Sequence, residues 1–308
     1  MVFNVLLPIF ILLFLGYLSV KISLINKEQI SALSAFVIRI SLPALLLVAL
    51  ASKDLHEIWY PSYFFVYAGV SFVLYLLVFL VFYYVFKHKF SHSAVFAMGG
   101  AMSNTGFIGT AILTLLMGNQ ATIYISLTLI VENVIIVTMV LALAEAGLQQ
   151  QKNIALLLRQ TLLKLLKNPV ILSVLLGLSL AFLQVKLPTQ LHQALDLLGK
   201  TASPIALFVI GGGLVGLSIE KIDMESMFLV FAKMIMMPVA VFTGLSLLPN
   251  VSKEMLYAGT IIAALPMPAA FAIFSQAYHL DDRKTLTPLM ISTFLGFAII
   301  SMLIALWW

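Results

Sequence analysis

Two interrupted apolar stretches decide the fold of this chain: AMSNTGFIG at residues 101–109 and AALPMPAA at residues 263–270. Each lies inside an apolar run that is long enough to cross a bilayer. Unpaired backbone groups at membrane depth are costly unless they face a cavity or a ligand. Broken helices at matching positions in two halves of a chain are therefore typical of a substrate site.

The composition indicates a chain that lies in a membrane. Hydrophobic residues make up 62% of the 308 residues and charged residues only 9%, whereas soluble domains carry about 25% charged residues. Cysteine is absent, which excludes disulfides and thiolate sites. The sequence predicts an all-α polytopic membrane protein that needs no cofactor, and the net charge of +5 indicates topology rather than nucleic-acid binding.

The predicted membrane-spanning helices are ten apolar runs. Eleven of the lysine and arginine residues in the loops follow odd-numbered spans, and three follow even-numbered spans. The positive-inside rule then places the odd loops in the cytoplasm and both termini outside. The ten runs are residues 2–22, 31–52, 62–86, 92–118, 120–145, 168–185, 191–218, 226–248, 254–278 and 285–308.

An internal repeat accounts for the spacing of the two breaks. A shift of 161 residues places Pro8 on Pro169 and Pro43 on Pro204 without a gap. Chance is the alternative, because apolar sequences match one another easily. Each half has five spans, so the second half must enter the membrane from the opposite side. This predicts two inverted five-helix repeats, with broken crossover helices in spans 4 and 9.

The repeat divides the chain into three predicted parts. Residues 1–145 form the first five-helix repeat, and residues 168–308 form the second, inverted repeat. Residues 146–167 form a cytoplasmic amphipathic linker, because leucines alternate there with basic residues.

The two breaks predict a binding site for an anion. Span 4 is expected to be helical to about Ser103, and Pro266 suits the first turn of a new half-helix in span 9. A half-helix that begins near the midplane presents free N–H groups and roughly +0.5 charge. The alternative is a pair of kinks that serve only packing. The predicted substrate-binding residues are Asn104, Thr105, Gly106, Pro266, Met267 and Pro268.

Charged residues inside the spans are the other candidates. Glu132 falls near mid-bilayer, where a carboxyl group suggests proton or ion coupling, and Asn133 adjoins it. A structural carboxyl group between helices is the alternative. Arg39 and Lys200 are predicted to attract anions into two vestibules, or else to snorkel toward the interface. Lys233 has no repeat counterpart and is expected to snorkel.

Several motifs resemble the auxin efflux carrier family, which includes plant PIN-FORMED carriers and bacterial malate or malonate permeases. The motifs are LPIF at residues 7–10, SLPALL at 41–46, SNTGFIG at 103–109, ALP at 264–266 and AIFSQAY at 272–278. The resemblance covers nearly the whole chain. It implies ten helices in inverted repeats, a scaffold of spans 1, 2, 6 and 7 that forms a homodimer, and a moving transport domain of spans 3–5 and 8–10.

This chain also departs from the plant pattern. The loop after span 5 is short, span 9 has two prolines, and Glu132 stands where plant members carry an uncharged polar residue. These departures favour a bacterial inner-membrane carrier of small organic anions, such as malate, malonate or auxin-like acids. Elevator motion and proton coupling are expected.

Three alternatives remain at this point. A sodium-coupled symporter of the bile-acid type shares the broken-helix architecture. A channel or sensor is the second alternative. An enzyme is the third and is not expected, because acidic and histidine clusters are missing from the sequence.

Overall fold

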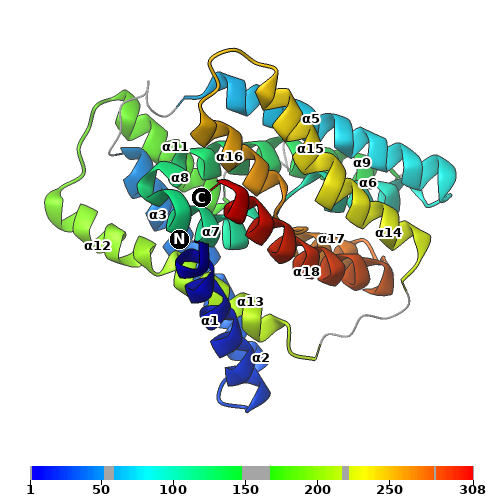
Figure 1. The fold of residues 1–308 in the computed structure, drawn as a ribbon, viewed down its shortest axis with the longest axis horizontal. Helices are drawn as coiled ribbons and strands as arrows, with labels where there is room; N and C mark the ends of the chain where they lie inside the picture. The colour runs from blue at the N-terminus through cyan, green and yellow to red at the C-terminus, as the bar shows by residue number, and fades with distance from the viewer. Residues whose placement is uncertain (1, 52–58, 148–166, 217–221, 281, 308) are drawn as a thin grey trace.

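Helices form the framework of the chain, and two of them are interrupted where the sequence predicts. A computed structural model describes residues 2–51, 59–147, 167–216, 222–280 and 282–307 (Figure 1), and within these ranges it contains no strand. The linker predicted at residues 146–167 lies almost entirely outside the described residues.

The first half of the chain contains helices with several short π-helical or 3-10 segments, labelled η. Their bounds are α1 Val2–Lys21, α2 Lys27–Phe36, η1 Val37–Ser41, α3 Leu42–Ala51, α5 Pro61–Leu80, η2 Val81–Val85, α6 Phe90–Ala101, η3 Thr105–Gly109, α7 Thr110–Met117, η4 Gly118–Gln120, α8 Ala121–Ile130, η5 Val131–Ile136 and α9 Val137–Gly147.

The second half of the chain is also helical. Its elements are α11 Pro169–Phe182, α12 Thr189–Lys200, α13 Ala202–Gly213, α14 Met224–Phe231, η6 Ala232–Met236, α15 Met237–Ser246, α16 Lys253–Ala263, α17 Ala269–Ala277 and α18 Asp282–Trp307.

Local sequence signals fix several helix starts. The Asn26 side chain accepts a hydrogen bond from the Gln29 N–H at 2.9 Å, and the Gln29 side chain accepts one from the Asn26 N–H at 2.9 Å. This capping box begins α2. Asn168 caps α11 in a similar way, with Pro169 in the first helical position, where a missing N–H costs nothing.

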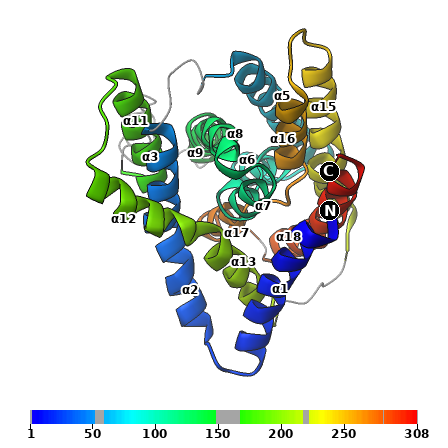
Figure 2. The same cartoon turned by 60° about the vertical axis from the view of Figure 1, so that its left-hand side comes forward.

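Six helical segments are long and apolar enough to cross a membrane, and shorter apolar helices accompany them. This confirms the prediction of an all-helical protein with several membrane-spanning segments. The count of ten spans and the inverted repeat stay predictions. The start of α1 and the end of α18 lie near each other (Figures 1 and 2), and the orientation of the termini stays a prediction.

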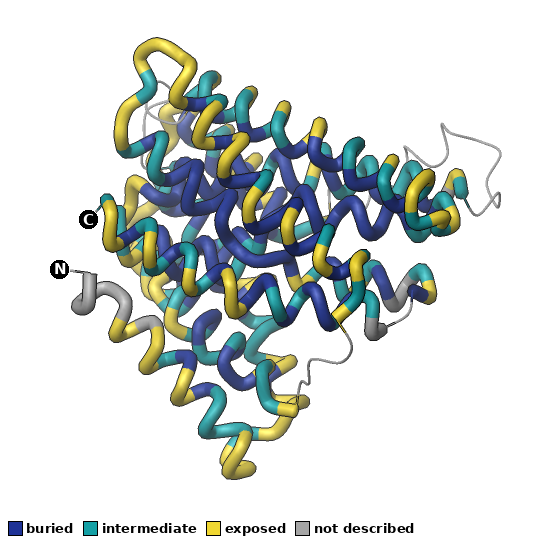
Figure 3. The backbone as a smooth tube through the Cα atoms, turned by 45° about the vertical axis from the view of Figure 1, so that its right-hand side comes forward, coloured by how far each residue is buried: buried dark blue, intermediate teal, exposed yellow. Residues whose placement is uncertain are grey.

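The helices fall into two groups. Helix α13 packs between α1 and α2, while α3 contacts α11 and α12, and Figure 2 shows these helices at the edge of the bundle. They correspond to spans 1, 2, 6 and 7. The main core lies among α5, α6, α8, η5 and α16, where Tyr63, Tyr67 and Phe82 are fully buried. Figure 3 shows this buried interior as the dark centre of the bundle.

The α1–α13 contact is made backbone to backbone. A Cβ atom on Gly16 would overlap the carbonyl of Phe208, and one on Gly211 would overlap the carbonyl of Leu13. Glycines therefore let these two helices approach more closely than any side chain permits.

Replacing Gly211 with alanine should separate α1 from α13. Overpacking of a tight contact costs about 1–3 kcal/mol, so Gly211→Ala should lower the thermal unfolding temperature of the purified protein in detergent. Gly213→Ala on the same helix is the matched control, because a Cβ atom there meets no atom within 4 Å. Equal unfolding temperatures for the two variants would contradict the close contact.

Candidate functional site

The two breaks lie against each other. Helix α6 ends at Ala101 and η3 begins at Thr105, while α16 ends at Ala263 and α17 begins at Ala269. The N–H of Asn104 donates a hydrogen bond to the carbonyl of Pro266 at 2.9 Å. Two segments that are far apart in the sequence therefore satisfy each other's backbone groups inside the bundle.

The breaks differ slightly from the predicted positions. The first helix stops two residues before Ser103, and the second half-helix starts after Pro268 rather than at Pro266. Met267 lies between the two half-helices, and its N–H donates to the Ser292 hydroxyl on α18 at 3.3 Å. Helix α18 also approaches closely through Gly296, where a Cβ atom would lie 3.0 Å from the Pro266 ring.

Glu132 lies directly behind the first break. Its Oε1 atom accepts hydrogen bonds from the Ser103 N–H at 2.9 Å, the Thr105 hydroxyl at 2.9 Å and the Tyr67 hydroxyl at 3.2 Å. Its side chain is 1% exposed. The Oε2 atom is buried and has no hydrogen-bond partner among the described residues. One oxygen thus ties three segments together, and the other is free to bind a proton.

Lys233 is part of the same cluster, and the expectation that it snorkels is wrong. It is 0% exposed, and its Nζ atom donates to the Ser103 hydroxyl at 2.9 Å, the Ala263 carbonyl at 2.6 Å and the Met237 sulfur at 3.2 Å. All three ammonium hydrogens therefore have acceptors. The physical reason is the break after Ala263, which leaves a carbonyl at the end of α16 for the ammonium group.

Ser103 connects the two charges. Its N–H binds the carboxylate of Glu132, and its hydroxyl accepts from the ammonium group of Lys233. The carboxylate lies at the start of η3, where helix N–H groups are unpaired, and the ammonium group lies at the carbonyl end of α16. Each charge therefore faces the helix end of opposite polarity.

Both charges also lie in π-helical segments, Glu132 in η5 and Lys233 in η6. A π-helical turn inserts one extra residue and so shifts the direction of a side chain relative to the helix around it. Such turns are common at functional sites.

The other side of the first break is accessible. Asn104 and Gly106 are partly exposed, whereas Ser103 and Thr105 are buried. Within the described part of the chain, the Asn104 side chain has no hydrogen-bond partner. Ala269, the first residue of α17, is exposed. Along this segment, Ser103 and Thr105 thus face the buried charges, and Asn104 and Gly106 face the open side.

The structure places the remaining predicted residues as follows. Pro266, Met267 and Pro268 are buried at the second break. The Asn133 amide donates to the Leu129 carbonyl of its own helix at 2.9 Å, so it does not join Glu132.

Neither predicted vestibule charge reaches the breaks. Arg39 is exposed on η1. Lys200 is exposed at the end of α12 and pairs with Asp196, one turn earlier, at 2.5 Å. These positions suit the alternative of side chains that extend toward an interface.

Sequence reasoning missed Tyr67, Ser292 and the buried role of Lys233. A signal for Tyr67 was present, because Tyr63, Tyr67 and Tyr75 are four and eight residues apart and so share one face of α5. No group of three or more His, Cys, Asp or Glu side chains within the described ranges could hold a metal ion.

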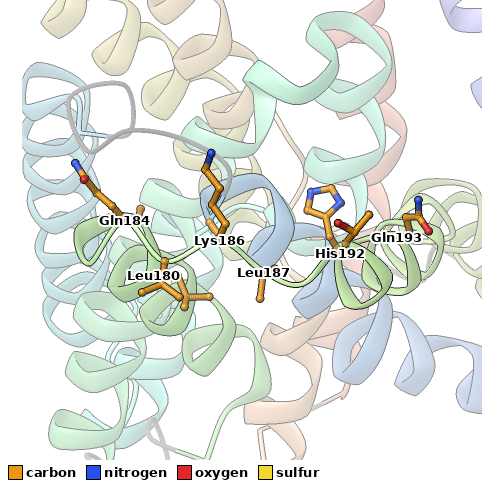
Figure 4. Close-up of a pocket in the computed structure, with 10 residues that line it drawn as sticks. Leu180, Gln184, Lys186, Leu187, His192 and Gln193 are labelled. Atoms are coloured by element: carbon orange, nitrogen blue, oxygen red, sulfur yellow. The ribbon is translucent and has the colours of Figure 1, made fainter.

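The cavities do not coincide with the breaks. A cavity of about 690 Å³ lies between the end of α11 and the start of α12. Figure 4 shows Gln184, Lys186, His192 and Gln193 around it. None of the predicted substrate-binding residues lines this cavity.

Apolar helices around charges buried at two meeting helix breaks define an integral membrane protein of the carrier class. The chain belongs to the membrane transport protein family, the PIN-like auxin efflux family, whose profile matches residues 1–307. The resemblance to auxin efflux carriers is thus confirmed.

Three relatives illustrate this membership. A protein of Rhizobium meliloti (strain 1021) named "Putative malonate transporter" is 27% identical over 97% of this chain and 94% of its own length. The uncharacterized transporter YfdV of Escherichia coli (strain K12) is 25% identical over 96% of this chain and 93% of its own. The lysosomal cholesterol signaling protein of Mus musculus is 22% identical over 96% of this chain and 36% of its own.

Removing Lys233 should destabilise the protein strongly. Loss of one partner from a buried charge pair costs about 3–5 kcal/mol, so Lys233→Met should lower the unfolding temperature markedly. Adding Glu132→Gln should restore part of the loss, because the double variant no longer buries a carboxylate without a counter-charge.

The control is Lys200→Met, since an exposed ion pair contributes only about 0–1 kcal/mol. If Lys233→Met and Lys200→Met unfold at the same temperature, the buried pair does not support the fold.

Proposed function

We propose that this protein is a secondary carrier of small organic anions, and that short dicarboxylates such as malonate are its substrates. The observation that carries the proposal is the contact between the two breaks, with the Asn104 amide, which has no partner among the described residues, on their open face. The name of the Rhizobium relative supports the substrate class.

The anion would bind to helix ends and to an amide rather than to an arginine. The first N–H groups of η3 and α17 lack acceptors within their own helices, and each helix start carries partial positive charge. The Asn104 amide adds a donor at the same place. Gly106 leaves room beside it for a carboxylate group.

Proton coupling would operate through Glu132. While Glu132 is ionised, its charge cancels that of Lys233 and the buried cluster is neutral. A proton on Oε2 removes the negative charge, so the positive charge of Lys233 acts on the open face. Protonation and anion binding then favour each other, which is the thermodynamic requirement for symport.

Sodium coupling, the alternative mechanism, has less support. A sodium site needs several convergent oxygen atoms. The Ser103 hydroxyl and the Ala263 carbonyl already accept hydrogen bonds from the ammonium group of Lys233, which adds a positive charge to the cluster that holds Glu132.

The packing of the helices supports an elevator mechanism. Helices α1, α2, α3, α11, α12 and α13 contact one another and would form a scaffold, through which two copies would form a dimer in the bacterial inner membrane. The helices that carry Glu132, Lys233 and the second break would move as the transport domain. The family description is that of a membrane transport protein, and the proposal includes no chemical step on the substrate.

Removing the Asn104 amide should weaken anion binding. A hydrogen bond to a charged group contributes about 1.5–3 kcal/mol, so Asn104→Ala should raise the half-saturating malonate concentration about tenfold or more. The measurement is the current evoked by concentration jumps of malonate, malate and indole-3-acetate, in proteoliposomes on a solid-supported membrane.

Asn133→Ala is the matched control, because the Asn133 amide binds its own helix. Unchanged anion currents in folded Asn104→Ala protein would contradict the proposed site. Non-saturating currents without counterflow would indicate a channel instead.

Replacing Glu132 should uncouple transport from pH. In Glu132→Gln no carboxylate balances Lys233, so the apparent malonate affinity should no longer rise as the pH falls. The exposed Glu28→Gln variant should keep the wild-type pH profile. Replacing sodium with choline should leave the wild-type currents unchanged, and a strict sodium requirement would favour the alternative mechanism.

A further inference from the structure

A polar stripe runs along the buried face of α5. Tyr63, Tyr67, Ser71 and Tyr75 follow one another at intervals of four residues, and all four are 0% exposed. Residues at this spacing lie on one face of a helix. Helix α5 thus places four hydroxyl groups in the protein interior rather than toward lipid, although buried hydroxyl groups are costly there.

Two of these hydroxyls connect α5 to the helix that carries Glu132. The Tyr63 hydroxyl and the Thr128 hydroxyl are 2.5 Å apart. One turn further along, the Tyr67 hydroxyl donates to Glu132. Thr128 and Glu132 are also four residues apart, so the contacts form two successive rungs between α5 and α8–η5.

Aromatic contacts extend the stripe to the surface. The Tyr63 ring stacks on Tyr67 with centroids 6.0 Å apart and contacts Tyr124 at 5.2 Å. Tyr124 stacks on the partly exposed Tyr60 at 5.5 Å and interacts with Glu254. These residues lie where α5, α8 and α16 begin, and the three helices contact one another (Figure 1).

Toward Tyr75, the polar stripe ends at a backbone carbonyl. The Tyr75 hydroxyl donates to the Ala94 backbone carbonyl at 3.0 Å. A carbonyl has no proton to pass on. The Ser71 hydroxyl, between Tyr67 and Tyr75, has no partner among the described residues. Along this stripe, the next hydroxyl pair after Tyr67 is therefore Tyr63–Thr128, one turn away from Glu132 toward the end of the bundle where Tyr124 lies.

We propose that the Tyr63–Thr128 hydroxyl pair is the route by which Glu132 exchanges its proton with the solution at the end where α5, α8 and α16 begin. The proposal rests on the proton coupling proposed above. A bridging water molecule passes the proton from Thr128 to Oε2, the carboxyl oxygen without a partner among the described residues, because the Tyr67 hydroxyl already donates to Oε1.

Each hydroxyl in the route gives up its own hydrogen and receives another, so no charged tyrosine remains. The net change is one carboxylate and one proton converted into one carboxylic acid. Transfer between the two rungs takes place by side-chain rotation or through one bridging water molecule.

The charged and titratable groups around the route are consistent with this assignment. Tyr67 faces Glu132 from α5, and Lys233 faces it from η6 through Ser103. The ammonium hydrogens of Lys233 are all bound to other acceptors, so Lys233 is not the proton source. At the outer end, Tyr124 of α8 faces Tyr63, and Glu254 of α16 interacts with Tyr124.

The test is proton movement during malonate uptake into proteoliposomes that contain a pH-sensitive dye. Thr128→Val keeps the side-chain shape and removes the hydroxyl, and Tyr63→Phe removes its partner. Each variant should slow malonate-driven proton entry at least tenfold, while malonate affinity at fixed pH stays within twofold of the wild type. Thr128→Ser should restore the rate.

Tyr75→Phe is the matched control, because its hydroxyl lies on the same stripe beyond Glu132, and it should keep the wild-type rate. Wild-type proton entry in folded Thr128→Val and Tyr63→Phe would overturn the route. That result leaves the proposed function intact if Glu132→Gln still abolishes pH dependence. If transport by the Glu132→Gln variant still depended on pH, the coupling proposal would be overturned, and the route with it.

Discussion

A carboxylate and an ammonium ion, both shut off from solvent, hold the two broken helices in contact through a single serine. Ser103 binds Glu132 with its N–H and Lys233 with its hydroxyl, and each charge faces a helix end of opposite polarity. Neither charge is stable in an apolar interior without the other. The breaks, in turn, are stable only because these groups satisfy the backbone atoms that an intact helix would have paired.

The extended segment between α6 and η3 separates two environments within three residues. Ser103 and Thr105 face the charged cluster, while Asn104 faces the open side. A change of charge on Glu132 or Lys233 therefore alters the electrostatic potential at Asn104 directly, without a relay through distant helices. Under the proposed function, this geometry would let a proton site and a substrate site be adjacent and coupled while their side chains remain distinct.

Local chemistry made part of this arrangement predictable from sequence. Proline, glycine and asparagine disfavour helix wherever they occur, so both breaks were predicted to within a few residues. Glu132 was predicted because a carboxyl group in an apolar run is rare. The burial of Lys233 was not predicted, because a lysine in an apolar run can equally well extend to the interface. Only the carbonyl freed at Ala263 favours the buried position. The contact of the Tyr67 hydroxyl with Glu132 depends on the packing of α5 against η5, which no local sequence pattern specifies.

The glycine contact between α1 and α13 has a consequence for how the chain is made. Gly16 belongs to a helix in the first half of the chain, whereas Gly211 belongs to a helix in the second half. At about 5–20 residues per second, the ribosome needs roughly 10–40 s to reach the partner. During that interval the glycine face of α1 lies against lipid or against whatever assists insertion. The close contact between α1 and α13 therefore forms late in biogenesis. Until then, the first half of the protein lies in the membrane without this contact.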